Sequence, residues 1–410
     1  MTKIVWMFPG VGSHYSGMGQ YFYKHFKIAQ ETFQEASDTL GIDMVSLCMD
    51  KSRRQDLNTL EHSQTALVTT SMAAVRVFEQ EIGLTPDAML GYSLGEYTAL
   101  CASGVIAFAD GLKLVHKRGL IVSQYASSID GTMAWVNNLD PEKVEQLCTE
   151  VTQAGEAVYL SAYDTPQKTS ISGSLAGIRL AGEKVVERGG IPIPLKMSGP
   201  FHSPLMKPAA ERYREQLVGI KIHSPKVPVI ANRNGLPYGD RESVLDNLSR
   251  QLVEPVRWLD SLQYLLDGGM RIAIEMGPKD VLKYLLHAVD PHPMILNYEK
   301  EKDVQKTNEA LVVQETDYKD VITQCLAIVA GTRNYSTDWL DYEDRVVGPF
   351  HQVQQRVEEW TLSNTSPTKH DVQVALLMMR EALRAKRIRE EERDHHLQRA
   401  LKNKVFQTHG

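Results

Sequence analysis

Short apolar runs alternate with longer helical segments along most of the chain. Ile4–Phe8 predicts a short buried strand that ends in the turn Pro9–Ser13. Helices are expected over residues 19–37 and 63–82, the latter with apolar residues at helical spacing. A second apolar run, Asp87–Leu90, follows. This alternation predicts an α/β domain with a parallel sheet.

The pattern changes between residues 130 and 196. Three strands are expected there in quick succession, then a helix at Ala176–Arg188 and a strand at Ile191–Leu195; the three strands are Met133–Val136, Val158–Ser161 and Thr169–Ser172. Strand–helix alternation resumes afterwards and fades near Asn297. We therefore expect a domain over residues 1–298 that carries a small α+β insert at 130–196.

Beyond Lys300 the chain is expected to be helical. Helices are predicted at Asp317–Ala330 and Asp338–Trp360, followed by a Ser/Thr/Pro-bearing linker at Ser363–Thr368. One long final helix, Asp371–Val405, is expected to carry an apolar stripe made of Val372, Leu376, Met379 and Leu383. We assign residues 299–362 to a helical extension and 363–410 to a linker with a charged helix.

Bulk properties exclude several classes of protein. The charged fraction is 23% and the hydrophobic fraction 42%, as in an ordinary globular protein. A net charge of −6 argues against nucleic acid or an anionic membrane surface as the main partner. No apolar run is long enough for a membrane span. The four cysteines are widely spaced and form no CxxC pair, so we expect a soluble cytoplasmic protein without a metal site.

The pentapeptide Gly91-Tyr92-Ser93-Leu94-Gly95 lies between a predicted strand and a helix-prone segment that runs to Ala102. This context is typical of a nucleophile elbow, in which glycines permit a sharp turn that exposes the serine hydroxyl. The N-terminus of the following helix then offers free N–H groups to a developing oxyanion. A chance match in a tight turn is the alternative. The context favours Ser93 as a nucleophile.

A serine nucleophile requires a base, and His202 is the candidate among thirteen histidines. It lies in Ser198–Met206, where one glycine and two prolines restrict the backbone. A lone histidine in a loop is more often inert, and only its pairing with Ser93 favours a catalytic role.

Several ordered motifs carry a resemblance to a known family. They are Phe8–Ser13, Gly91–Glu96, Leu114–Gly119, Gly199–Met206, Gln251–Trp258 and Glu275–Pro278. Together they resemble the malonyl-CoA:acyl-carrier-protein transacylases, including the discrete acyltransferases of polyketide and lipopeptide synthesis, over residues 3–298. The resemblance implies a hydrolase-like core with a central parallel sheet and a ferredoxin-like insert.

The resemblance also implies roles for individual residues. Ser93 would be the nucleophile and His202 its base, with the backbone carbonyl of Gln251 orienting the imidazole. Val11 and Leu94 would supply the N–H groups of the oxyanion hole. Three further residues would contact the substrate. Arg118 would bind the free carboxylate of a malonyl group, Gln64 would lie near the oxyanion hole, and Phe201 would form a wall of the acyl pocket. Without the resemblance, Arg118 would be interpreted as a helix surface charge.

The implied reaction moves a malonyl-type group from coenzyme A to the phosphopantetheine thiol of an acyl carrier protein through an acyl-serine. It needs no metal or redox cofactor, and we expect a monomer. Tyr92, beside the nucleophile, stands where the family usually has histidine. Ala162 and Asp164 stand where relatives usually carry asparagine. These departures leave a substituted malonyl group possible.

Two other functions remain as alternatives. One is an acyl hydrolase that clears stalled carrier proteins, although its relatives tend to lack the arginine matched by Arg118. The other is a non-catalytic scaffold that binds carrier proteins. The basic residues of the final helix suggest docking to an acidic carrier or synthase, against a plain solvated helix; they are Arg384, Lys386, Arg387, Arg389 and Arg393.

Overall fold

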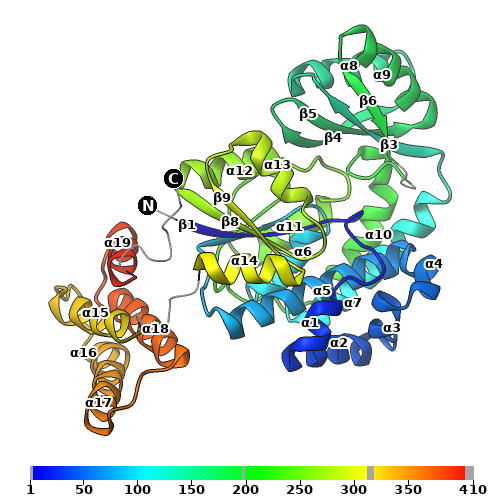
Figure 1. Ribbon diagram of the computed structural model, residues 1–410. Helices are drawn as coiled ribbons and strands as arrows, with labels where there is room; N and C mark the ends of the chain where they lie inside the picture. The colour runs from blue at the N-terminus through cyan, green and yellow to red at the C-terminus, as the bar shows by residue number, and fades with distance from the viewer. Residues whose placement is uncertain (1–2, 196–198, 312–317, 402–410) are drawn as a thin grey trace. The chain divides into compact units, whose positions relative to one another are not determined.

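The computed structural model describes residues 3–195, 199–311 and 318–401, which form two compact units, residues 3–304 and the helices that follow (Figure 1). Parts of three sequence predictions lie outside these ranges. They are the end of the insert at Lys196, the start of the loop of His202 at Ser198, and the start of the helix expected from Asp317. The part of the expected final helix beyond Leu401 also lies outside them.

A five-stranded parallel sheet forms the centre of the first unit. Its order is β7-β2-β1-β8-β9, and its strands are β1 (Lys3–Phe8), β2 (Ala88–Gly91), β7 (Val229–Ile230), β8 (Met270–Met276) and β9 (Met294–Tyr298). The strands are apolar and buried because helices cover both faces. In Figure 1, α12 and α13 lie on one side of the sheet and α5 and α7 on the other.

Alternation along β1 divides the core into two layers. Val5 and Met7 pack with apolar residues of α12 (Trp258–Asp267) and α13 (Val281–Val289). Trp6 faces the opposite layer, where its ring meets Phe78 of α5 (Leu60–Glu81) edge-on. The remaining helices of this unit are α1 (Gln20–His25), α2 (Lys27–Leu40), α3 (Met44–Met49), α4 (Arg54–Leu57), α6 (Gly95–Ala102), α7 (Phe108–Ala126), α10 (Lys207–Leu217) and α11 (Arg241–Arg250). Helix α14 (Glu301–Leu311) spans the boundary between the two units at residue 304.

The insert is a four-stranded antiparallel sheet of order β4-β5-β3-β6. Its elements follow one another as β3 (Gly131–Asn137), α8 (Pro141–Gln153), β4 (Val158–Thr165), β5 (Lys168–Ser174), α9 (Leu175–Glu187) and β6 (Ile191–Pro194). This βαββαβ succession is the ferredoxin-like arrangement. The predicted fold class, with its central parallel sheet, ferredoxin-like insert and helical extension, is confirmed.

The second unit is helical. Its elements are α15 (Tyr318–Gly331), α16 (Trp339–Tyr342), a π-helical turn at Glu343–Val347, α17 (Gly348–Ser363), α18 (Lys369–Ala385) and α19 (Glu390–Ala400). Helices α15 and α18 pack together through buried residues such as Cys325 and Met379. The helices on both sides of the linker therefore belong to one unit.

The prediction of one long final helix is wrong. Helix α18 ends at Ala385 in a Schellman motif, with Arg387 in the left-handed region at φ 57° and Ile388 N–H donating to Leu383 O at 3.0 Å. Lys386 is buried, and its Nζ donates to the carbonyls of Val329 and Thr332. Lys386 thus contributes no surface charge to the proposed docking cluster. Residues 19–37 likewise form two helices, separated at Phe26, where φ is −130°.

Among the described residues, no helix combines the length and the hydropathy that a membrane crossing requires.

Candidate active site

Ser93 lies on the sharp turn between β2 and α6, with φ at 51°. A Cβ on Gly91 would lie 1.9 Å from the carbonyl carbon of Gly95, and a Cβ on Gly95 would lie 2.0 Å from Phe8 O. Both flanking positions therefore require glycine. The close approach of these backbones is what lets the serine stand in a left-handed conformation at the carboxyl end of the sheet.

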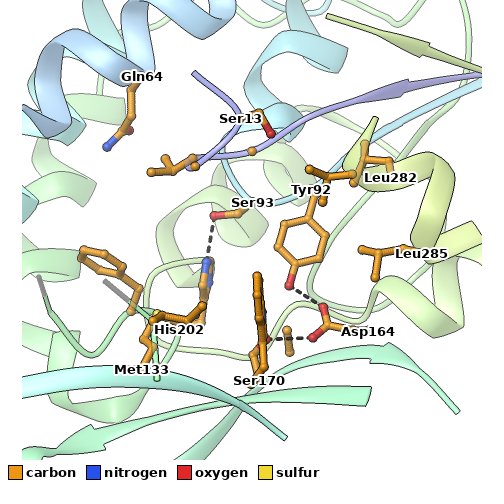
Figure 2. Close-up of a pocket in the computed structure, with 18 of the residues that line it drawn as sticks. Ser13, Gln64, Tyr92, Ser93, Met133, Asp164, Ser170, His202, Leu282 and Leu285 are labelled. Atoms are coloured by element: carbon orange, nitrogen blue, oxygen red, sulfur yellow. Dashed lines mark hydrogen bonds between the residues drawn. The ribbon is translucent and has the colours of Figure 1, made fainter. Parts of the chain in front are cut away.

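His202 meets Ser93 from the loop that precedes α10. Its Nε2 lies 2.8 Å from Ser93 Oγ (Figure 2). Its Nδ1 lies 2.7 Å from the carbonyl oxygen of Gln251. A carbonyl only accepts, so Nδ1 carries the proton and Nε2 accepts from the serine hydroxyl. Burial and the nearby Arg118 charge lower the pKa of His202 to about 4. The imidazole is therefore neutral and able to take a proton at pH 7.

Arg118 is a buried guanidinium on α7. Its Nη1 donates to Gln64 Oε1 at 2.7 Å and its Nη2 to Gln251 Oε1 at 3.2 Å. Among the described residues no carboxylate forms an ion pair with it, and its Nε has no hydrogen-bond partner. Its guanidinium also lies over the ring of Tyr97, 5.6 Å from the centroid. A buried cation that forms no direct ion pair is suited to binding an anion.

A polar network behind the elbow was not foreseen from the sequence. Asn232, which follows β7, accepts from Ser93 N–H at 2.7 Å and donates to Gly91 O at 2.6 Å. Glu96 accepts from Asn232 N–H at 2.8 Å and from the Tyr238 hydroxyl at 2.7 Å. These bonds fix both ends of the turn. Asn232 lies two residues beyond the end of β7, and no local sequence pattern marks it as part of a site.

Gln251 connects this network to the histidine. Its amide nitrogen donates to Ser93 O at 2.9 Å and to Glu96, while its backbone carbonyl accepts from His202. One residue thus contacts the nucleophile turn, the histidine and Arg118.

The N–H groups of Val11 and Leu94 are available as hydrogen-bond donors. Within the described chain, neither donates to a protein acceptor. Val11 lies in the loop after β1, and Leu94 directly precedes α6, whose first N–H groups have no acceptor within the helix.

A cavity of about 340 Å³ opens in front of Ser93. The sequence-predicted residues that line it are Val11, Gln64, Tyr92, Ser93, Arg118, Phe201 and His202. Leu94 and Gln251 do not line it, and Gln251 acts from behind through the hydrogen bonds described above.

Tyr92 is anchored to the insert. Its hydroxyl donates to Asp164 Oδ1 at 2.6 Å, and Ser170 Oγ donates to Asp164 Oδ2 at 2.8 Å (Figure 2). Its ring packs against Trp258 with centroids 5.5 Å apart. Two of the three departures noted in the sequence, Tyr92 and Asp164, are therefore hydrogen-bonded to each other on one wall of the cavity.

The family model for the acyl transferase domain matches residues 5–293 of this chain. This chain belongs to the acyltransferase family. It is 38% identical over 291 residues to the malonyl CoA-acyl carrier protein transacylase of Bacillus subtilis strain 168, covering 71% of this chain and 91% of that protein. It is 36% identical over 283 residues to the enzyme of the same name from Escherichia coli K12, covering 69% of this chain and 91% of that protein.

Another Bacillus subtilis protein of that name is 32% identical over 368 residues, covering 87% of this chain and 91% of the relative. The matched part of this chain is longer than the unit formed by residues 3–304, so the match extends into the C-terminal helices. The fold also matches the crystal structure of the Clostridium perfringens malonyl CoA-acyl carrier protein transacylase, with TM-score 0.72, 33% identity and coverage of 75% of this chain and 96% of the other.

A malonyl-transacylase solved in complex with its type II PKS acyl-carrier protein gives TM-score 0.72 at 32% identity, covering 74% of this chain and 98% of the other. Among the described residues of the acyltransferase, no group of three or more His, Cys, Asp or Glu side chains is arranged to hold a metal ion.

Proposed function

We propose that this acyltransferase moves a malonyl group from coenzyme A to the phosphopantetheine thiol of an acyl carrier protein. The observation that carries the proposal is the placement of the Ser93–His202 pair, 2.8 Å apart, in one cavity with the buried Arg118. Malonyl CoA-acyl carrier protein transacylases are the relatives that match this chain.

In the first half-reaction, His202 Nε2 takes the proton of Ser93 as Oγ attacks the thioester carbonyl. The N–H groups of Val11 and Leu94 stabilise the resulting oxyanion. The intermediate collapses, the carbon–sulfur bond breaks, and the departing thiol of coenzyme A takes the proton from His202.

In the second half-reaction, His202 takes the proton of the carrier thiol, and the sulfur attacks the acyl-serine. Ser93 leaves and recovers its proton from the imidazolium. Gln251 keeps the imidazole in the tautomer that both steps need. No metal or redox cofactor takes part in this scheme.

Arg118 selects a dicarboxylic acyl group by binding its free carboxylate through two parallel N–H donors. The side-chain oxygens of Gln64 and Gln251 each accept one hydrogen bond from the guanidinium and orient it. Phe201 and the anchored Tyr92 line the same cavity as Ser93, and we propose that they limit the α-substituents it accepts. The proposed group is therefore malonyl itself.

The proposal extends to the organisation and setting of the protein. Residues 1–298 act as the acyltransferase domain with its insert at 130–196, and residues 299–362 and 363–410 form the extension. Four free, buried cysteines support a reducing, cytoplasmic location. The product serves polyketide, lipopeptide or fatty acid synthesis by delivering malonyl groups to a separate carrier.

Incubation with labelled malonyl-CoA, followed by intact mass of the protein, tests the proposal. We expect one malonyl group on Ser93 that moves to a holo carrier protein. A label that decays without transfer would favour the acyl hydrolase, and no label would favour the scaffold.

A further inference from the structure

Six non-glycine residues of the described chain have a left-handed backbone. Asn138 and Asn364 are of the type that tolerates this conformation, and Arg387 ends a helix. The other three are Ser93, His202 and Lys279. Ser93 and His202 belong to the reactive pair, which leaves Lys279, with φ at 67°, as the one residue whose strained backbone is unexplained.

Lys279 lies in the turn between β8 and α13, beside the loop that carries Val11. Its Nζ donates to the carbonyl oxygen of Gly12 at 2.7 Å. The turn itself packs against this loop, because a Cβ on Gly277 would lie 3.1 Å from Pro9 Cγ. The two segments are neighbours because β1 and β8 pair in parallel, so their carboxyl ends meet at one edge of the sheet.

The backbone of Lys279 is fixed independently of its side chain. Its N–H donates to Glu299 Oε2 at 3.0 Å, and its carbonyl accepts from the Asn297 amide. Glu299 also accepts from the hydroxyl of Tyr15, which lies just beyond the Val11 loop. The lysine ammonium therefore extends to Gly12 from a backbone that is held in place by these hydrogen bonds.

The loop held in this way is the one that presents the Val11 N–H. Ser13 N–H donates to Gly10 O at 3.3 Å, which closes a tight turn around Val11 and Gly12, and Gly12 has φ 100°. With a glycine at this position the turn has few intrinsic restraints. A bond to the Gly12 carbonyl limits rotation of the peptides that set the direction of the Val11 N–H.

We propose that Lys279 is a positioning residue for acyl transfer: its ammonium holds the Gly12 carbonyl and thereby aims the Val11 N–H at the oxyanion. The inference rests on the proposed function. Since the oxyanion exists only in the transition state and the intermediate, the contribution of Lys279 falls on the rate at saturating donor rather than on donor binding.

The test is the rate of Ser93 acylation by malonyl-CoA in single turnover, as a function of donor concentration. Lys279→Met keeps an unbranched side chain that is one heavy atom shorter and removes its donor. We expect a saturating rate roughly tenfold to a hundredfold lower, with the half-saturating concentration unchanged. Lys279→Arg restores a donor and is expected to recover most of the rate.

Lys279→Gly separates positioning from folding. Glycine relieves the left-handed backbone, so the Tm is expected to be no lower than in the wild type, while the acylation rate falls as in Lys279→Met. Asn138→Gly, a matched change at φ 63° in the insert, is expected to leave the rate unchanged.

A wild-type saturating rate in Lys279→Met would overturn the inference. So would a rise in half-saturating concentration alone, which would indicate an anion contact with coenzyme A. If the wild type itself takes no malonyl group, the proposed function fails; if it does and Lys279→Met matches it, only the inference about Lys279 fails.

Discussion

The hydroxyl of Tyr92 donates a 2.6 Å hydrogen bond to Asp164, so the residue preceding the nucleophile is tied to β4 of the insert. Asp164 is buried and receives a second hydrogen bond from Ser170. Burial raises the pKa of Asp164, and both hydroxyl donors oppose that rise. The pair links the central sheet to the insert at the wall of the reaction cavity.

Tyr92→Phe is expected to lower the free energy of unfolding by about 1–3 kcal/mol, because it leaves a buried carboxylate oxygen without its donor. In the double variant with Asp164→Asn the losses are expected to be less than additive. Urea unfolding measures both. Tyr264→Phe, at a side chain that is 43% exposed, is the control; an equal loss there would contradict the assignment.

Arg118→Ala is expected to reduce kcat/KM for malonyl-CoA on the order of 10²–10³-fold, because the substrate carboxylate loses its buried partner. Acetyl-CoA has no free carboxylate and should not suffer that loss. Competition between the two donors, read by intact mass, checks this. Lys117→Ala changes an exposed charge on the same helix and should leave the ratio as it is. An unchanged ratio in Arg118→Ala would remove the carboxylate role.

The pH dependence of acylation should follow the lowered pKa of His202. The neutral imidazole is the base, so kcat/KM is expected to stay flat from about pH 8 to about pH 5 and to fall near pH 4. A half-maximal rate near 6.5, the ordinary histidine value, would contradict the burial of the imidazole.

The free energy of unfolding should also depend on pH through the titration of His202. Between pH 6.5 and about 4, His202 is protonated in the unfolded chain but stays neutral in the folded chain, because its pKa is lowered only in the folded state. The contribution of His202 to stability is therefore complete above pH 6.5 and is lost as the pH falls through this window. Replacing His202 with Asn should flatten that part of the curve in urea unfolding measured across pH.

The sequence predicted the fold well where local rules decide it. The apolar run of β1 and the glycines at 91 and 95 encode a buried strand and a sharp turn by themselves. The meeting of Ser93 with His202 joins residues far apart in the chain, and only the ordered family motifs pointed to it. Asn232 and Tyr238 were missed because neither belongs to a local pattern with a catalytic meaning.

The final helix was mispredicted for a physical reason. Helix ends are usually marked by glycine at the left-handed position, and here that position is Arg387 inside a run of charged helix formers. The break depends on tertiary contacts, since Ile388 is buried and the Lys386 carbonyl accepts from Tyr335 N–H.

Lys386→Met is expected to weaken the C-terminal unit by about 1–3 kcal/mol, because the carbonyls of Val329 and Thr332 lose a charged donor. Hydrogen exchange of the α15 and α18 amides measures the change, and Ser93 acylation should remain at the wild-type rate. Arg389→Met, at an exposed position, is the control. Equal protection in the two variants would contradict a structural role for Lys386.

The account depends above all on Ser93 as the carrier of the acyl group. The most direct measurement is the intact mass of wild-type protein and of Ser93→Ala after malonyl-CoA, followed by addition of holo acyl carrier protein. We predict one malonyl group on the wild type that passes to the carrier, and none on the variant. Undiminished transfer by Ser93→Ala, or a malonyl group on another residue, would contradict it.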